Sequence, residues 1–479
     1  MLSNNGIVML SDIIDIKHGF AFKGEFFKDE KTSNVLVTPG NFRIGGGFKA
    51  DKFKYYDGPV EADYILKEGD LVVTMTDLSK QADTLGYSAL IPRNDKHTFL
   101  HNQRVGLVTI KDEEKVDKKF LYFLLRTSEY RHFVVGSATG STVKHTSPSR
   151  ILSYSCELPD IISQKKIAKL LIELEERIDA NSLLNSQLES LSQAIFKSWF
   201  VDFDPVHAKK NALEAGLTKI QAERASMAVI AGLCSPTEYA EDKIKIEKKL
   251  EERLTSIGKE KAEELKTTAS LFPSEFEDSE LNSVPKGWEV KPIKDLANVI
   301  NGRAYKNDEF KTEGTPIVRI QNLSENGGKT VFSDLDLPED KFIDKGDLIY
   351  AWSATFGPYI WKGRRSIYHY HIWKMVVTNY VCKHYLYLSL SRMTEHLKAQ
   401  GTGSIFTHLT KTIMEEQKML VPDEGLAKFS ASIFENIFKL ILQKNDEIKM
   451  LQELRDTLLP KLLSGVINLD KIQIKSEAP

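Results

Sequence analysis

The sequence predicts an α+β protein with two mixed domains in tandem, each followed by a long helix. Two observations lead to this fold class: five blocks of sequence occur twice in the same order, and an apolar stripe with helical spacing follows each set. A helix of about 40 residues is about 60 Å long, too long to bury its stripe in a domain of about 150 residues. We therefore expect the two helices to pair as an antiparallel coiled coil, with a pseudo-twofold relation between the domains. An ordinary core helix is the alternative.

The duplication rests on blocks that keep their order along the chain. TGSTVKH (139–145) matches TGSIFTH (402–408) at four of seven positions. The other pairs are LSDIIDIKHGFAFK (10–23) with IKDLANVINGRAYK (293–306), KEGDLVV (67–73) with DKGDLIY (344–350), FLYFLLR (120–126) with YLYLSLS (385–391), and ELPD (157–160) with LVPD (420–423). One such pair could arise by chance, whereas five in order indicate a tandem repeat.

Each mixed domain combines short β-rich runs with one amphipathic helix. The runs, such as DLVVTM and DLIYAW, are separated by Gly, Pro, Asn and Asp, and the helices are expected at KKFLYFLLRTSEYRHF and KHYLYLSLSRMTEHLK. We assign the chain to the first domain (1–156), first long helix (157–200), charged helical spacer (201–285), second domain (286–423), second long helix (424–465) and C-terminal tail (466–479).

The two long helices carry stripes of mainly three- and four-residue steps. The first runs from Ile167 to Ile195 and is interrupted by Asn181; the second runs from Phe429 to Leu458, with Lys444 at the position of Asn181. This pattern is typical of a coiled coil with a polar flaw in its middle. The spacer contains EYAEDKIKIEKKLEERLTSIGKEKAEELK (238–266), which predicts a solvated connector helix or part of a partner contact.

Composition and charge restrict the function classes. The net charge of −2 hides an uneven distribution: residues 201–285 carry −5, whereas residues 1–156 and 286–425 each carry +2, which permits nucleic-acid contact without requiring it. The longest apolar run, MAVIAGLC (227–234), is far shorter than the roughly 20 residues of a membrane helix. The start of the chain is not typical of a signal peptide, and three scattered cysteines fit a reducing compartment. We therefore expect a cytoplasmic protein without membrane contact.

No catalytic motif is complete. The GGGF segment (45–48) lacks the lysine of a phosphate loop, and DPVH (204–207) lacks the second proline and the aromatic residue of an amino-methyltransferase tetrad. A nuclease-like PD and ExK pattern exists at Pro422–Asp423 and Glu447–Lys449, but about 36 Å of helical rise separates its halves. His369 and His371 have no evident third ligand for a metal. A soluble chain with two related heads and no catalytic residues suggests a two-headed DNA reader.

Three stretches resemble the specificity subunit of type I restriction-modification enzymes. They are FKSWFVDFDPV (196–206), LFPSEF with VPKGWEVKPIKDLA (271–276 and 284–297), and LRDTLLPKLLSGVI (454–467). The resemblance covers essentially the whole chain and is quite specific in combination, although the spacer at 207–270 is unusually long and charged.

The resemblance implies a division of labour between subunits. Each mixed domain would be a target-recognition domain that reads one half of a split double-stranded DNA target, and the helices would set the distance between the halves. The chain would hold two methyltransferase subunits, which methylate adenine with S-adenosylmethionine, and two restriction subunits, which use ATP and Mg²⁺. It would bind no cofactor or metal and catalyse no reaction itself. Two alternatives remain open: a fragment of a nuclease or methyltransferase, and a duplicated protein-binding scaffold that does not contact DNA.

Residues that read bases are expected where the two copies differ, because different half-sites need different side chains. The divergent segments are TDLSKQAD (76–83), HNQR (101–104), SATFGPY (353–359) and KGRRSIYHYH (362–371). Arginine suits guanine, and asparagine or glutamine suits adenine, in the major groove. The candidate base readers are Lys80, Gln81, Gln103, Arg104, Arg364 and Arg365.

The repeated TGSxxxH motif provides a second set of candidates. Its glycine permits a tight turn, and its small hydroxyl residues suit phosphate contacts; alternatively, the motif shapes the junction between domain and helix. The candidates are Ser141, Thr142, Lys144, His145, Ser404 and His408. Trp199 and Phe200, at the end of the first long helix, would either pack on a methyltransferase subunit or cap the intramolecular helix pair.

Overall fold

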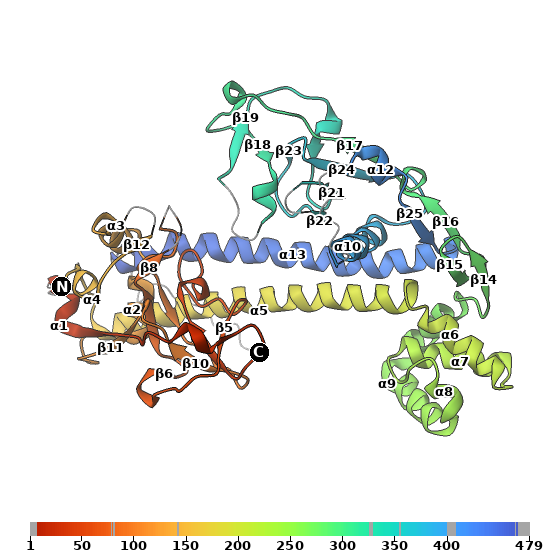
Figure 1. The fold of residues 1–479 in the computed structure, drawn as a ribbon, viewed down its shortest axis with the longest axis horizontal. Helices are drawn as coiled ribbons and strands as arrows, with labels where there is room; N and C mark the ends of the chain where they lie inside the picture. Colours follow the sequence, from red (N-terminus) through yellow and green to blue (C-terminus); the bar gives the residue numbers. More distant parts are fainter. Residues whose placement is uncertain are drawn as a thin grey trace. The chain divides into compact units, whose positions relative to one another are not determined.

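The computed structural model describes residues 7–77, 79, 82–140, 143–324, 329–353, 356–399, 409–464 and 466–467. The chain divides into two compact units: unit 1 comprises residues 1–180 and 447–479, and unit 2 comprises residues 181–446 (Figure 1). Each unit contains one mixed domain and a segment of each long helix. Within the described part of the chain, no helix is long and apolar enough to cross a membrane.

The mixed domain of unit 1 runs from β1 to β13 and contains two main sheets. One has the order β3-β5-β4-β10-β6 and the other β2-β11-β7-β9, and β1-β13 and β12-β8 form two small pairs. The strands are β1 (Ile7–Met9), β2 (Ile14–His18), β3 (Phe27–Lys28), β4 (Asn34–Val37), β5 (Lys54–Tyr56), β6 (Ile65–Leu66), β7 (Leu71–Thr74), β8 (Thr76–Asp77), β9 (Ser88–Leu90), β10 (Thr98–His101), β11 (Val105–Ile110), β12 (Lys144–His145) and β13 (Ser155–Glu157). The helices are α1 (Leu10–Ile13), α2 (Lys118–Leu124), α3 (Ser128–Gly136) and α4 (Pro148–Leu152).

The mixed domain of unit 2 runs from β14 to β25 and repeats this arrangement. Its main sheets have the orders β19-β18-β23-β20 and β17-β24-β21-β22, and the small pairs are β16-β25 and β14-β15. The strands are β14 (Phe276–Ser279), β15 (Asn282–Pro285), β16 (Glu289–Pro292), β17 (Ala297–Asn301), β18 (Thr315–Val318), β19 (Val331–Ser333), β20 (Phe342–Ile343), β21 (Leu348–Ala351), β22 (Gly357–Ile360), β23 (Ser366–Tyr368), β24 (Ile372–Val377) and β25 (Lys418–Val421). The helices are α10 (Lys383–Ala399) and α12 (Lys411–Glu415). The predicted tandem repeat is thus confirmed at the level of sheet order.

A glycine in each copy explains part of the sequence repeat. A Cβ atom on Gly19 would lie 2.3 Å from the carbonyl oxygen of Asn102, and one on Gly302 would lie 2.3 Å from the carbonyl oxygen of His369. Only glycine permits such a close approach of two backbones. The contact also identifies Asn102 and His369 as equivalent positions in the two domains, although their side chains differ.

The single amphipathic helix expected in each domain occurs only in the second. In unit 1 the segment breaks into α2 and α3 at Thr127, whose hydroxyl accepts a hydrogen bond from Tyr130 N (3.3 Å) and donates one to Leu124 O (2.9 Å). A threonine that caps a new helix in this way ends the preceding one. In unit 2 the corresponding helix, α10, is continuous.

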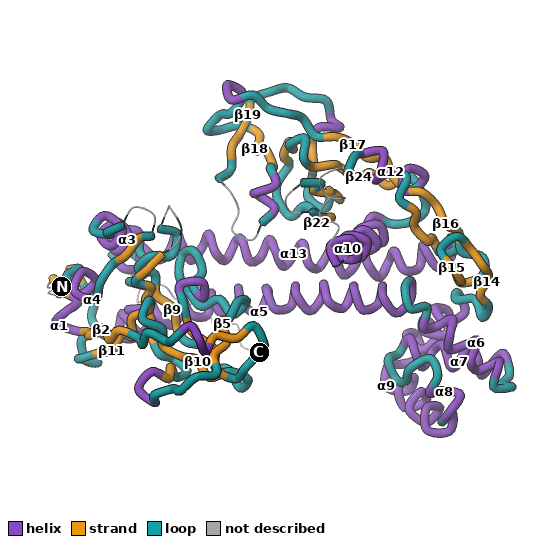
Figure 2. The backbone as a smooth tube through the Cα atoms, viewed as in Figure 1, coloured by secondary structure: helices purple, strands orange, loops and turns teal. Residues whose placement is uncertain are grey.

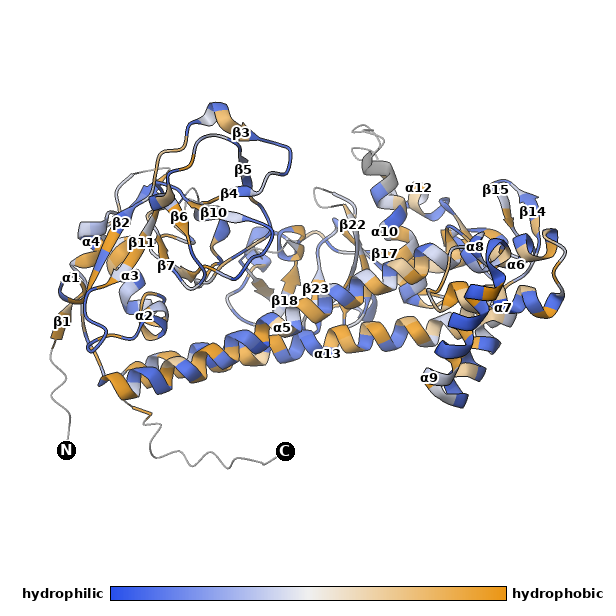
Figure 3. Ribbon diagram, turned by 90° about the horizontal axis from the view of Figure 1, so that it is seen from below, coloured by the Kyte–Doolittle hydropathy of each residue, from blue (hydrophilic) through white to orange (hydrophobic). Residues whose placement is uncertain are grey.

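The two long helices, α5 (Ile161–Phe200) and α13 (Glu424–Leu463), pair in an antiparallel manner within each unit. In unit 1, Glu175 contacts Arg455 and Arg177 contacts Glu447, so the residue number falls on α13 as it rises on α5. In unit 2, the rings of Phe196 and Phe434 lie 6.4 Å apart, and Glu189 lines the same cavity as Ile441. Here too the residue number falls on α13 as it rises on α5. The predicted antiparallel pairing is confirmed. Figure 3 shows apolar and polar residues alternating along both helices.

The polar flaw in the stripe is a buried feature. Asn181 and Asn185 are both buried on α5. A buried asparagine at a coiled-coil position specifies the register of the helices at some expense of stability. These residues therefore favour one alignment of the pair over its slipped alternatives.

The charged stretch 238–266 is helical as expected, but its helices pack on others and do not form a solvated connector; its contact with a partner stays a prediction. The spacer folds into α6 (Asp204–Glu214), α7 (Lys219–Ile230), α8 (Glu238–Glu241) and α9 (Lys243–Ser270), which share an apolar core that includes Ile246 and Leu250. α9 is interrupted at Gly258, whose φ of 83° is accessible mainly to glycine. The charged pattern of the sequence concealed this core because the apolar residues that α9 contributes, such as Ile246 and Leu250, are scattered among charged ones. Figure 2 shows that this insert is helical, whereas strands and long loops form most of the mixed domains.

Candidate nucleic-acid interface

A two-residue turn between β10 and β11 presents Gln103 and Arg104 at the surface of unit 1. Three hydrogen bonds hold its backbone: Val105 N donates to Asn102 O (2.9 Å), Arg104 N to the Asn102 side-chain oxygen (3.1 Å) and Gln103 N to Phe20 O (3.0 Å). Both side chains are exposed. A rigid turn with a carboxamide and a guanidinium pointing outward offers the donors and acceptors that read purine edges.

Two further segments lie directly beside this turn. Met75 N donates to Arg104 O (2.9 Å), and Met75 O accepts from Thr146 N (3.0 Å). The next residues pair as two short strands, with Lys144 opposite Asp77 and His145 opposite Thr76. Candidates from distant parts of the sequence, namely Gln103, Arg104, Lys144 and His145, therefore gather on one side of the domain.

The repeated glycine motif builds the hairpin that carries Lys144 and His145. Thr139 and His145 exchange backbone hydrogen bonds of 2.9 and 3.0 Å, and Gly140 has a φ of 97°. A Cβ atom on Gly140 would lie 2.0 Å from Val143 O, so the turn requires glycine. The hairpin pairs with β8 and so contributes to the candidate interface. His145 is exposed, and its Nδ1 lies 3.1 Å from the hydroxyl oxygen of Thr76.

Asp77, at the end of β8, is a buried carboxylate that binds Ser79 and Thr84. It accepts hydrogen bonds from Ser79 N (2.6 Å), from Thr84 N and from the Thr84 hydroxyl (2.7 Å). Burial alone would raise the pKa of Asp77, but the hydrogen bonds from Ser79 and Thr84 outweigh it and hold this pKa below its ordinary value. The negative charge of Asp77 is thus buried and hydrogen-bonded, which limits its repulsion of a phosphate backbone.

The two candidate arginines of unit 2, Arg364 and Arg365, differ in how freely their side chains could contact a base. Arg365 donates to both carboxylate oxygens of Glu339 (2.8 and 2.7 Å) and to Asp344 (2.8 Å), and these acidic partners raise its pKa. Arg364 is exposed, with its guanidinium 5.7 Å from the ring centre of Phe332. Base reading by Arg365 would require breaking two ion pairs, whereas Arg364 remains accessible.

Six candidates lie outside the described residues, and the proposals about them stay predictions. They are Lys80, Gln81, Ser141, Thr142, Ser404 and His408.

The residues that suggested catalysis have structural roles. Asp423 caps α13 by accepting hydrogen bonds from Gly425 N (2.9 Å) and Leu426 N (3.1 Å), and Glu447 pairs with Arg177. Throughout the described ranges, no group of three or more His, Cys, Asp or Glu side chains could hold a metal ion.

A family model for the type I restriction modification DNA specificity domain matches this chain twice, at residues 3–190 and 285–450. The chain belongs to this family of DNA specificity subunits. The specificity subunit of the HindI type I restriction enzyme from Haemophilus influenzae is 29% identical over 440 residues, covering 86% of this chain and 89% of the relative. The MjaIX specificity subunit from Methanocaldococcus jannaschii is 21% identical over 405 residues, covering 81% and 76%.

A solved structure supports the fold of this specificity subunit. The S subunit of the type I restriction-modification system from M. genitalium matches with a TM-score of 0.51 at 15% identity, over 97% of this chain and 98% of that one. At this identity the likeness concerns the fold alone. Because the two matches of the family model include the two mixed domains, these are the target-recognition domains of the family.

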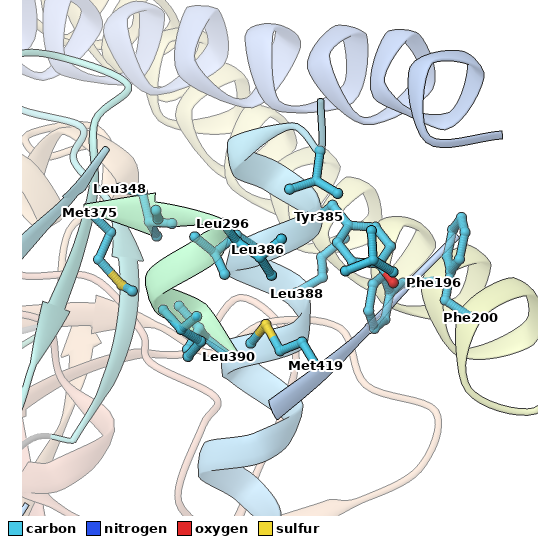
Figure 4. Close-up of a cluster of buried hydrophobic side chains, with 14 of the residues drawn as sticks. Phe196, Phe200, Leu296, Leu348, Met375, Tyr385, Leu386, Leu388, Leu390 and Met419 are labelled. Atoms are coloured by element: carbon cyan, nitrogen blue, oxygen red, sulfur yellow. The ribbon is translucent and has the colours of Figure 1, made fainter. Parts of the chain in front are cut away.

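Trp199 and Phe200 are not available for a partner subunit. They are only 6% and 4% exposed and belong to the apolar core of unit 2. Phe200 contacts the rings of Tyr385 and Trp288, and Trp199 contacts Phe272. Figure 4 shows Phe196 and Phe200 beside Tyr385 in this core. Of the two sequence-based alternatives, the structure supports packing within the chain, because domain and helix residues enclose both rings.

Sequence reasoning assigned no DNA-reading role to Tyr370 and His371 of the second recognition domain, of which Tyr370 is exposed and His371 is half-buried. Tyr370 and His371 form the turn between β23 and β24, the counterpart of the turn that carries Gln103 and Arg104. They lie in the divergent segment KGRRSIYHYH, whose arginines match the chemistry of base reading more closely than its aromatic residues do. The strand order, applied to the sequence alignment of the copies, could have identified them.

Proposed function

We propose that this specificity subunit reads one half of a bipartite DNA target with each recognition domain and directs partner subunits to it. The observation that carries the proposal is that two copies of one frame present different side chains at the same turn. A repeated frame supplies two similar docking modes, and different side chains supply two different half-sites.

The arrangement in unit 1 supports a division between base and phosphate contacts. Gln103 and Arg104 have the chemistry for base edges, whereas Lys144 and His145, on the neighbouring hairpin, have the chemistry for phosphates. The recognition domain carries a small positive excess, so electrostatic attraction by this chain alone would be modest. Strong binding would then depend on partner subunits that make further contacts with the duplex.

The partners we propose are two methyltransferase subunits and two restriction subunits. S-adenosylmethionine, ATP and Mg²⁺ would be bound by those subunits, with adenine methylation and cutting carried out there. This chain would be non-catalytic, in keeping with the structural roles of Asp423 and Glu447. The long helices, 40 residues each, would set the distance between half-sites.

The test is to map methylated adenines in cells that carry the chain with its methyltransferase subunits. The proposal predicts a motif of two specified parts separated by an unspecified gap of constant length. A continuous motif, or no dependence of the methylated sites on this chain, would contradict it. As a second readout, the purified chain alone should neither methylate nor cut the same DNA.

A further inference from the structure

The second recognition domain contains a turn, Tyr370–His371, that occupies the place of Gln103–Arg104 in the first. Tyr370 is exposed and His371 is half-buried. In unit 1 the turn connects β10 with β11; in unit 2 it connects β23 with β24. The preceding strands are equivalent, because β10 pairs in parallel with β4 and β23 pairs in parallel with β18. The following strands are also equivalent, because each lies at the same position in its four-stranded sheet.

The backbone hydrogen bonds around the two turns correspond one to one. In each turn one backbone hydrogen bond closes the turn itself. A second joins the turn to the residue after Gly19 or Gly302, and a third joins it to the residue after the neighbouring strand, β7 or β21. The pairs are Val105 N to Asn102 O (2.9 Å) with Ile372 N to His369 O (2.9 Å), Gln103 N to Phe20 O (3.0 Å) with Tyr370 N to Arg303 O (3.0 Å), and Met75 N to Arg104 O (2.9 Å) with Trp352 N to His371 O (3.1 Å). The correspondence places Tyr370 at the position of Gln103 and His371 at that of Arg104.

Aromatic packing makes the second turn rigid. The Trp352 indole N–H donates to Tyr370 O (2.9 Å), and the Trp352 ring lies 5.0 Å from the ring of His371. The Tyr370 ring lies 3.9 Å from that of His371 and 4.4 Å from that of His369. Little conformational entropy would be lost when this turn contacts a ligand, which favours a specific contact over a nonspecific one.

The turn also offers polar groups to solvent. Tyr370 is 41% exposed. A tyrosine that serves only in packing would be expected to bury more of its ring. Among the described residues, no side chain forms a hydrogen bond with its hydroxyl group. Burial lowers the pKa of His371, so its imidazole is neutral near pH 7 and carries one donor and one acceptor.

We propose that Tyr370 and His371 determine the specificity of the second half-site, by hydrogen bonds from phenol and imidazole to base edges and by contact of the tyrosine ring with a thymine methyl group. The inference rests on the proposed function and deepens it. Arg365, held by Glu339 and Asp344, would support the neighbouring loop, and Arg364 would at most contact a phosphate. The first half-site would be read by a carboxamide and a guanidinium, and the second by aromatic groups.

The test compares four variants of the chain in cells that carry the complete system, with methylated adenines mapped across the genome. Tyr370→Phe removes only the hydroxyl group, and His371→Asn keeps a donor and an acceptor on a smaller side chain. Asn298→Ala, at an exposed position of β17 that pairs with Val376 at the end of β24 far from the turn, is the control within the same domain. Arg104→Ala, at the equivalent turn of the first domain, is the control for the other half-site.

We expect the two turn variants to lower discrimination at one or two positions of the second half-site by about 10- to 100-fold, the range for one base contact, and to leave the first half-site unchanged. Arg104→Ala should change only the first half-site, and Asn298→Ala should change neither half-site. An unchanged second half-site in active Tyr370→Phe and His371→Asn complexes, or a changed one in Asn298→Ala, would overturn the inference.

If a turn variant abolishes methylation, thermal unfolding of the purified complex shows whether it is folded, and DNA-binding measurements show whether it still distinguishes the second half-site. A folded variant complex that no longer distinguishes the intact second half-site from one with a substituted base supports the inference. Undiminished discrimination in binding contradicts it. Failure of the proposed function is seen separately, because the unmodified chain would then give no two-part motif.

Discussion

The two recognition domains share a frame and differ at the positions that face outward. Their sheets have corresponding strand orders, and Gly19 and Gly302 make the same close backbone contact. At the equivalent turn, however, one domain carries the exposed Gln103 and Arg104, and the other carries the exposed Tyr370 and the half-buried His371. Repeated sequence blocks thus maintain the frame, whereas the specificity of each copy is expected in the segments that the repeat does not conserve.

The domains also differ in how they attach to the long helices. In unit 1 the buried Arg126 donates to Glu175 on α5 (2.5 Å), which also accepts from Arg455 on α13 (3.2 Å). In unit 2 the position equivalent to Glu175 is Phe438, which stacks on His384 at 4.4 Å. One joint is therefore held by buried charges and the other by aromatic packing, so the two should respond differently to substitution and to pH.

The largest effect is expected from Phe438→Ala. Phe438 is 3% exposed and contacts His384 and Tyr387, so truncation should leave a cavity and destabilise unit 2 by about 4 kcal/mol. Urea unfolding of the full chain measures this loss. A destabilisation below about 1 kcal/mol would show that the aromatic joint contributes little.

Arg126→Met should destabilise unit 1 by about 3 kcal/mol, because Glu175 loses its most buried partner. Ser391→Ala, at the matching position of unit 2, is the control and should change the free energy of unfolding by less than about 0.5 kcal/mol. Both values come from the same denaturant titrations. Equal effects of the two substitutions would refute the charged joint.

The joint of unit 2 should weaken in acid. Burial, with a smaller contribution from Lys383, lowers the pKa of His384 to about 4. The unfolded chain, with a histidine pKa of about 6.5, binds the proton first, so stability is full above pH 6.5 and falls as the pH decreases toward 4. From these values the loss is about 2 kcal/mol at pH 5. His384→Phe, which keeps a stacked ring, should remove this part of the pH dependence; identical pH profiles for the two proteins would contradict the assignment.

The sequence predicted the frame more completely than the interface. Tandem domains and antiparallel helices follow from repeats and periodicity, which are properties of whole segments. The core of the insert was missed because Ile246 and Leu250 are scattered among charged residues. Trp199 and Phe200 were ambiguous because aromatic residues suit both a core and a contact surface. The role of the turn at Tyr370 depends on strand order, which no local pattern encodes.

The smallest change is expected from removing one heptad from each long helix, at matching positions. Each heptad contributes about 10.5 Å of helix, and base pairs rise about 3.4 Å each, so the gap should shorten by at most ~3 bp. The half-site sequences should stay the same, since neither recognition domain is altered. Maps of methylated adenines give both quantities. An unchanged gap in an active complex would mean that the helices only hold the subunit together.

The most direct test of two independent readers is an exchange of the whole first recognition domain. Residues 1–156 are replaced by the corresponding domain of a related specificity subunit, and methylated adenines are mapped in cells that carry the exchanged chain with its partner subunits. We expect one half of the motif to change to that of the donor, while the other half and the gap are retained. A change in both halves would contradict the account.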